Sequence, residues 1–135
     1  MTPLFAKRLL IVEDDRNALA GLQELLRQEG FRVCGVTDSR RALEAAAHET
    51  FELALCDYCL PGMNGLQLCW ELKKRQPGLT FILVTAYRHP ELVHAAGQLG
   101  IEKVLGKPII LDELLETLAA AASYEDTCIA QNVSH

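Results

Sequence analysis

The sequence predicts an α/β domain in which five β-strands alternate with five α-helices. Short apolar runs alternate with segments whose apolar residues recur at helical spacing, and no Ser/Gly-rich linker or internal repeat divides them. The apolar runs are nearly continuous, as in strands that are buried on both faces. Strands that alternate with helices form a parallel sheet with right-handed crossovers, covered by helices on both sides.

The first strand is predicted over residues 9–13 and the second over residues 31–36. Gly30 suits the position that follows a helix C-terminus, so the helix between these strands should end there. Its inward face is expected to carry five apolar residues, which are Ala18, Leu19, Leu22, Leu25 and Leu26.

Ser39 is predicted to cap a second helix that runs to about His48, and Asn64 is predicted to cap the third. Residues 53–56 form the third strand between them. Pro77 and Gly78 should stop the third helix. The predicted inward residues are Ala42, Leu43, Ala46 and Ala47 in the second helix, and Leu66, Leu68, Cys69 and Leu72 in the third.

The remaining elements are a strand at residues 81–84, a helix from Pro90 to Gly100, a short strand at 103–105 and a helix at 111–122. Residues 1–122 are therefore assigned to one domain. The tail at 123–135 shows no clear period and is expected to be frayed.

Composition limits the classes of partner. A chain of 135 residues suits one domain. The formal charge of −5, with scattered lysines and arginines, argues against nucleic acid as a binding partner.

No stretch reaches the roughly 18 apolar residues of a membrane span, and the start does not resemble a signal peptide, so a cytoplasmic protein is expected. Five cysteines, an odd number, argue against a disulfide framework.

Polar residues stand where four of the predicted strands end. They are Glu13 and Asp14, then Asp57, then Thr85, then Lys107. The carboxyl ends of parallel strands meet at one edge of an open α/β sheet, where ligands bind. We therefore expect three carboxylates, a hydroxyl and an ammonium group to converge there.

Carboxylates without nearby histidine or cysteine ligands favour a hard cation, and Mg²⁺ fits best because it leaves room for a phosphate oxygen. Asp14 and Asp57 would bind it directly, and Glu13 through water. A carboxylate beside Mg²⁺ can attack a phosphoryl group, which makes Asp57 the candidate nucleophile. Thr85 and Lys107 would then contact the other phosphoryl oxygens.

The residues at these strand ends match the motifs of a known protein family. The sequence from about residue 8 to 122 is similar to the receiver domain of two-component response regulators. The motifs are Glu13-Asp14, Asp57 followed by Leu-Pro-Gly-Met-Asn-Gly at 60–65, Thr85-Ala86 and Lys107-Pro108. The resemblance implies a flavodoxin-like sheet of order 2-1-3-4-5 and a cis Lys107-Pro108 peptide.

The resemblance also implies a function. Asp57 would be phosphorylated by a sensor histidine kinase or a histidine phosphotransfer protein, with Mg²⁺ held by Asp14, Asp57 and the backbone carbonyl of Cys59. The phosphorylated domain would then switch binding to a downstream protein or to a missing effector domain. It would catalyse only its own phosphorylation and dephosphorylation. A stand-alone protein and a truncated regulator both remain open, and the start at Met1 favours the first.

Two alternative functions remain open. Receivers usually carry Tyr or Phe where this chain has Val104, which favours a phosphorylation-independent interaction module; we hypothesise that Tyr87 takes over part of the aromatic switch. Phosphatases of the haloacid-dehalogenase type also use an aspartyl nucleophile, but Asp57-Tyr58-Cys59 lacks their second Asp. Cys56 and Cys59 form a C-x-x-C sequence, yet Cys56 should point into the core, which argues against a redox pair.

Overall fold

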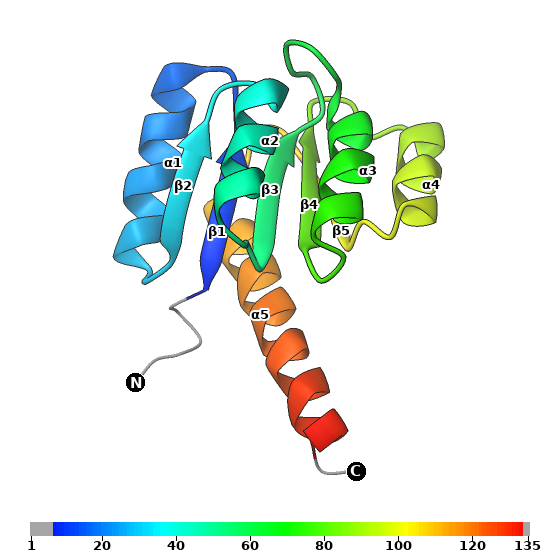
Figure 1. The fold of residues 1–135 in the computed structure, drawn as a ribbon. Coiled ribbons are helices and arrows are strands. Elements are labelled where there is room, and N and C mark those ends of the chain that lie inside the picture. The colour runs from blue at the N-terminus through cyan, green and yellow to red at the C-terminus, as the bar shows by residue number, and fades with distance from the viewer. Residues whose placement is uncertain (1–6, 134–135) are drawn as a thin grey trace.

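The computed structural model describes the backbone of residues 7–133 and the side chains of residues 7–122. Its centre is a parallel sheet of order β2-β1-β3-β4-β5 (Figure 1). This confirms the predicted α/β class and the strand order that the resemblance implies. The strands are β1 (Arg8–Val12), β2 (Arg32–Val36), β3 (Leu53–Asp57), β4 (Thr80–Thr85) and β5 (Lys103–Gly106).

Helices cover both faces of the sheet, and each face has its own apolar cluster. Leu10, Ala54 and Phe81 pack on one side with the second, third and fourth helices, while Leu9, Leu53 and Ile82 pack on the other with the first and last helices. Successive strand residues therefore enter opposite clusters, which explains the nearly continuous apolar runs. The helices are α1 (Arg16–Gln28), α2 (Ser39–His48), α3 (Gly65–Arg75), α4 (Pro90–Gln98) and α5 (Leu111–Val133).

The predicted signals at the helix ends are partly confirmed. Asn64 caps α3 in a capping box, because its side chain accepts from the backbone N–H of Gln67 and the Gln67 side chain accepts from the N–H of Asn64. Gly30 and Gly100 have φ values of 102° and 77°, so each takes the left-handed conformation that ends a helix.

The predicted cap of α2 is wrong. Asp38 is the N-cap, and its Oδ1 accepts from the backbone N–H of Arg41 at 2.8 Å. Ser39 is the first helical residue, and its buried hydroxyl donates to the carbonyl oxygen of Met63 at 2.7 Å. Both residue types favour caps. The Ser39 hydroxyl is engaged by the distant carbonyl of Met63, a contact that sequence cannot show, and Asp38 is therefore the residue that caps the helix.

Two predicted inward alanines are also exposed, Ala18 in α1 and Ala47 in α2. Alanine fits either face of a helix, because its small side chain adds little burial energy on the inner one. The larger residues decide which way the helix faces, as Leu19 and Leu26 do in α1.

The last helix is longer than predicted, because α5 ends at Val133 and not near residue 122. No Gly or Pro interrupts the sequence between these positions, so nothing in the backbone chemistry stops the helix. Figure 1 shows its second half continuing past the edge of the sheet. The predicted fraying of the tail at 123–135 concerns packing outside the described side chains. No helix in the described part of the chain is both long and apolar enough to cross a membrane.

Candidate functional site

Three carboxylates meet at the carboxyl edge of the sheet. Glu13 and Asp14 follow β1, Asp57 ends β3, and one oxygen of each lies within 4.8 Å of the others. The two strands are direct neighbours, with Val12 in register with Cys56. Consecutive positions after that pair are therefore adjacent. Glu13 and Asp57 are only 5% and 7% exposed, whereas Asp14 is open to solvent.

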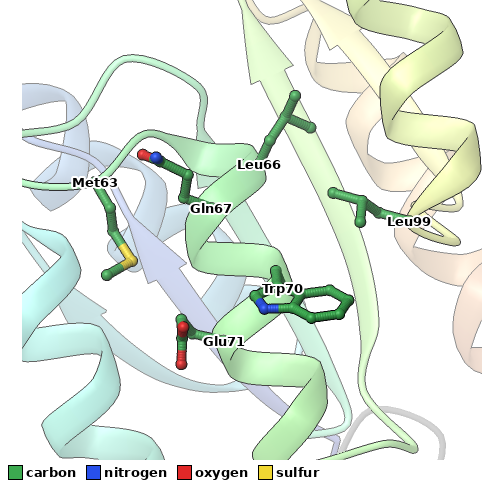
Figure 2. Close-up of a pocket in the computed structure, with 6 residues that line it drawn as sticks. All are labelled: Met63, Leu66, Gln67, Trp70, Glu71 and Leu99. Atoms are coloured by element: carbon green, nitrogen blue, oxygen red, sulfur yellow. The ribbon is translucent and has the colours of Figure 1, made fainter.

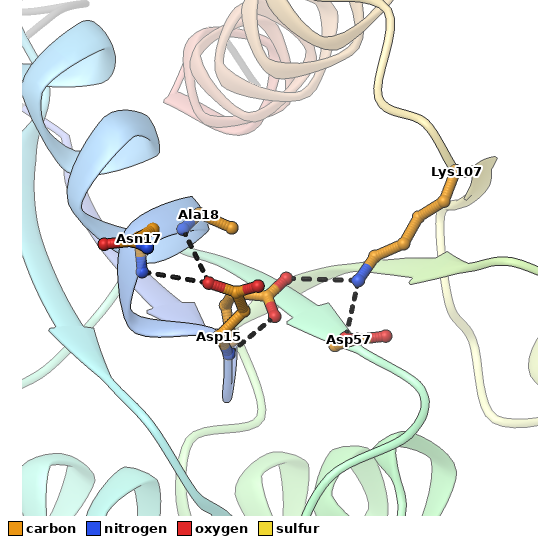
Figure 3. A network of polar contacts seen from close by, with 6 residues as sticks. Asp15, Asn17, Ala18, Asp57 and Lys107 are labelled. Atoms are coloured by element: carbon orange, nitrogen blue, oxygen red, sulfur yellow. Dashed lines mark hydrogen bonds and ion pairs between the residues drawn. The ribbon is translucent and has the colours of Figure 1, made fainter.

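Lys107 supplies the positive charge of the site. Its Nζ lies 2.8 Å from Oδ2 of Asp57 (Figure 3). The same Nζ lies 3.2 Å from Oε1 of Glu13. The lysine follows β5, and the end of β4 lies between it and β3. Its backbone N–H donates to the carbonyl of Thr85 at 2.9 Å, which fixes the base of the side chain as it reaches across that strand.

The surroundings of Lys107 shift its protonation equilibrium. Burial alone lowers the pKa of the ammonium group, but hydrogen bonds and charge attraction, first from Asp57 and then from Glu13, outweigh it. The pKa of Lys107 is therefore raised above 10.5. The ammonium group stays charged at neutral pH and balances part of the acidic cluster.

Asp15 orders the loop that carries two of the acids, a role that the sequence interpretation missed. Its backbone N–H donates to Oε2 of Glu13 at 3.0 Å, and its carboxylate accepts from the N–H groups of Asn17 and Ala18, which caps α1 (Figure 3). An Asp just before a helix with apolar periodicity is a known cap signal that could have identified it. The cap therefore fixes the loop after β1, which contains Glu13 and Asp14.

Thr85 is buried at the end of β4, beside β3, but its hydroxyl is used within its own loop. Oγ1 accepts from the backbone N–H of Tyr87 at 3.1 Å. No hydrogen bond joins this hydroxyl to the carboxylates among the residues that the structure describes. The two residues that follow it, Ala86 and Tyr87, are exposed.

The two cysteines of the C-x-x-C sequence have different environments. Cys56 is buried, and burial, followed by the nearby Cys69 and Asp57, raises the pKa of its thiol well above the usual value. Cys59 is exposed in the loop that follows Asp57. A buried protonated thiol on a strand and an exposed thiol on a loop do not form a redox pair. The Lys107-Pro108 peptide is cis, as the resemblance implies.

The donor set suits a hard divalent cation. It consists of carboxylate oxygens, with no histidine or cysteine in the same cluster of described residues. One of the three carboxylates, that of Asp14, is open to solvent and leaves a path for an ion.

Comparisons with known proteins agree with this site. The sequence model of the response regulator receiver domain matches residues 9–119. The transcriptional regulatory protein ZraR of Escherichia coli K12 is 32% identical over 123 residues, which is 91% of this chain and 28% of that protein. The sensor histidine kinase AruS of Pseudomonas aeruginosa is 36% identical over 117 residues, 84% of this chain and 12% of the kinase. The chain thus spans a small part of these relatives.

Solved receiver structures have the same fold. A CheY-like receiver domain protein from Methanospirillum hungatei has a TM-score of 0.86 and 31% identity, covering 90% of this chain and 98% of that one. The response regulator TrrA of Thermotoga maritima, solved with Mg²⁺ and BeF, has a TM-score of 0.76 and 28% identity over 85% and 98%. The chain belongs to the response regulator receiver domain family, whose members are phospho-acceptors in two-component signal transduction.

Proposed function

We propose that Asp57 is the phospho-acceptor of this receiver domain. The observation that supports this most directly is the contact of 2.8 Å between Asp57 and Lys107 inside a cluster of three carboxylates. A nearly buried carboxylate held by an ammonium group is oriented for attack. The same ammonium group can neutralise charge on the incoming phosphoryl oxygens.

In the proposed step, a carboxylate oxygen of Asp57 attacks the phosphorus of a phosphohistidine on a sensor histidine kinase or a histidine phosphotransfer protein. An O–P bond forms, the P–N bond breaks, and the electron pair leaves with the imidazole nitrogen, which takes up a proton from solvent. Lys107 moves from its contact with Asp57 to a phosphoryl oxygen. Thr85 contributes only after its hydroxyl turns away from the N–H of Tyr87.

Mg²⁺ is the proposed cofactor, held by Asp14, Asp57 and the backbone carbonyl of Cys59, with Glu13 acting through water. When bound, it neutralises phosphoryl oxygen charge and orients that group. The exposed position of Asp14 and the oxygen-only donor set support this assignment. The direct contact of Glu13 with Lys107 supports its placement outside the first coordination sphere.

Phosphorylation would change the affinity of the domain for a protein partner, either a separate protein or an effector domain of a longer regulator. The domain would act in the cytoplasm and turn over no separate substrate. The haloacid-dehalogenase alternative has no added support, because the second residue after Asp57 is an exposed cysteine and not an acid. The phosphorylation-independent module rests on Val104 alone, which is buried beside β4.

The test is phosphorylation by acetyl phosphate with Mg²⁺, followed by intact mass measurement. The wild type should gain one phosphoryl group, and Asp57→Asn should gain none. Asp112→Asn, which removes an exposed acid from the first turn of α5, is the matched control and should behave as the wild type. Failure of the wild type to gain mass with acetyl phosphate and with a phosphorylated histidine phosphotransfer protein would contradict the proposal. Turnover of p-nitrophenyl phosphate would favour the phosphatase.

A further inference from the structure

Three arginines surround a pocket at the opposite end of the sheet. Arg8 begins β1, Arg32 begins β2 and Arg27 lies in the last turn of α1. Together they line a cavity of about 380 Å³, whose other walls are Phe31, Val33, Cys34 and Glu49. The amino ends of the strands form this pocket, whereas the carboxylates of the candidate phospho-acceptor site follow the carboxyl ends.

The backbone brings two of these positive charges together. Arg8 and Arg32 are register partners on neighbouring strands. Like charges directly opposite one another in a sheet repel. The pairing places Leu9 opposite Val33 and Leu10 opposite Cys34, so the apolar core fixes this register and the arginines cannot separate by a slip.

The pocket contains too few acids to balance its arginines. Nη1 of Arg8 lies 2.7 Å from Oε1 of Glu49, and this is the one ion pair among the residues that line it. Within the described part of the chain, no carboxylate lies within ion-pair distance of Arg27 or Arg32. The lining residues alone, three arginines and one glutamate, leave two positive charges, on a chain whose formal charge is −5. The neighbouring Glu52 carboxylate accepts from the backbone N–H of Arg8 at 2.6 Å and does not line the pocket.

Ordinary structural roles explain the arginines singly. Arg27 suits the negative end of the α1 dipole, and a charged residue on edge strand β2 discourages pairing with other sheets. Neither role requires all three arginines to line one pocket. The grouping of three arginines around one pocket, together with the apolar Phe31 and Val33, is the feature that these roles leave unexplained.

We propose that this pocket binds a phosphoryl dianion, the terminal group of a phosphomonoester or free phosphate. Guanidinium groups match phosphate oxygens with paired, charge-assisted hydrogen bonds. A dianion would balance the two excess charges. The apolar walls formed by Phe31 and Val33 suit the organic part of an ester, and the cavity volume lies in the lower part of the range of about 300–1,000 Å³ for small-ligand sites.

The site can be tested separately from the proposed phospho-acceptor. Divalent cations are first removed with a chelating resin, because without them the acidic cluster at Glu13, Asp14 and Asp57 repels phosphate. Amide NMR shifts are then followed while inorganic phosphate or phenyl phosphate is added at constant ionic strength. The expected result is saturable shifts at Val33 and Cys34 in both wild type and Asp57→Asn.

Arg27→Gln and Arg32→Gln each remove one exposed guanidinium group without touching the core. Charge-assisted hydrogen bonds contribute enough that either change should weaken phosphate binding about tenfold. Arg40→Gln is the matched control, because it makes the same charge change on the exposed surface of α2 and should leave the affinity unchanged.

The two ligands separate the possible sources of the phosphoryl group. Equal affinity assigns the site to free phosphate, and tighter binding of the ester assigns it to a phosphomonoester. Three results would overturn the proposal. They are no saturable shift in the wild type, the same phosphate affinity in Arg27→Gln and Arg32→Gln as in the control Arg40→Gln, or shifts confined to the carboxyl edge of the sheet. None of these results depends on whether Asp57 is phosphorylated.

Discussion

The contact between Lys107 and Asp57 illustrates how single residues act in this molecule. Sequence placed both residues at strand ends, but their ion pair depends on a side chain that crosses the end of β4. Glu13 shares the same ammonium group. An interaction of this kind has a pH dependence that can be derived from the direction of the pKa shift.

Lys107→Met should remove a contribution to stability that is present only while the lysine is protonated. The folded pKa is raised above 10.5, so the contribution is complete below the unfolded value and is lost as pH rises through the folded value. The difference in free energy of unfolding between wild type and variant should therefore be constant to about pH 10 and shrink above it. Urea unfolding across this range measures it.

Lys74→Met is the control, because it removes an exposed lysine of α3 that forms an ion pair with Glu71 outside the site. A difference between wild type and Lys107→Met that stayed constant through pH 12 would show that the ion pair does not act as described.

Exposed cysteines should react with an alkylating reagent faster than buried ones in the described part of the chain. Cys59 is exposed and should be alkylated first in the native protein. Burial raises the pKa of Cys69 to about 11, despite an opposing effect of Lys73, and the thiol of Cys56 is also shifted upward. Both should react only after unfolding. Peptide mapping after a short iodoacetamide pulse measures this, with Cys59→Ser as the control; fast labelling of native Cys56 would contradict the structure.

At the scale of elements, hydrogen bonds fix the loop between β3 and α3, which follows the candidate phospho-acceptor Asp57. The backbone N–H of Gly65 donates to the carbonyl of Tyr58 at 2.7 Å, and Ser39 from α2 donates to Met63 in the same loop. The capping residue Asn64 could be predicted from sequence. The close backbone approach at Gly65 could not, because it depends on where α3 meets β3.

Gly65→Ala should destabilise the protein and slow phosphorylation. A Cβ at this position would lie 2.7 Å from the carbonyl oxygen of Asp57 and 2.9 Å from Cα of Tyr58, so the backbone has to shift. The expected loss is about 1–3 kcal/mol in free energy of unfolding, as for other overpacked sites. Gly97→Ala is the matched control in α4, where a Cβ meets nothing within 4 Å and should add up to about 1 kcal/mol. Equal stability of the two variants would rule out the close approach.

Gln76→Ala should also be destabilising, through a connection between elements. The Gln76 side chain accepts from the N–H of Phe51 and donates to the carbonyls of Ala46 and Glu49. It therefore ties the end of α3 to the last turn of α2 and to the segment between α2 and β3. Its removal leaves partly buried backbone groups without partners, at a cost of about 1–3 kcal/mol. Chemical denaturation measures this. Gln28→Ala, which loses only an exposed hydrogen bond to Glu24, should change little.

For the whole molecule, stability and the proposed cofactor should be linked. A ligand that binds only the folded state stabilises it by about 2.7 kcal/mol at 100 times its dissociation constant. Mg²⁺ should therefore raise the unfolding temperature of the wild type and shift Asp14→Asn much less. Asp112→Asn should respond as the wild type, because its acid lies outside the cluster. An equal Mg²⁺ response in all three proteins, measured by calorimetry, would remove Asp14 from the cation site.

Sequence by itself determined the class of fold, the order of the elements along the chain and the meeting of Glu13, Asp14, Asp57 and Lys107 at one edge of the sheet. Apolar periodicity is local, and polar residues such as Asp57 and Lys107 stand at or just after the ends of apolar runs, so both signals can be read without coordinates. Tertiary structure alone decided which partners these residues have. It assigned Ser39 to Met63, turned the Thr85 hydroxyl to Tyr87 and gathered Arg8, Arg27 and Arg32 around one pocket. Hydrogen bonds and charge pairs between distant segments depend on positions of a few ångströms, which no local pattern records.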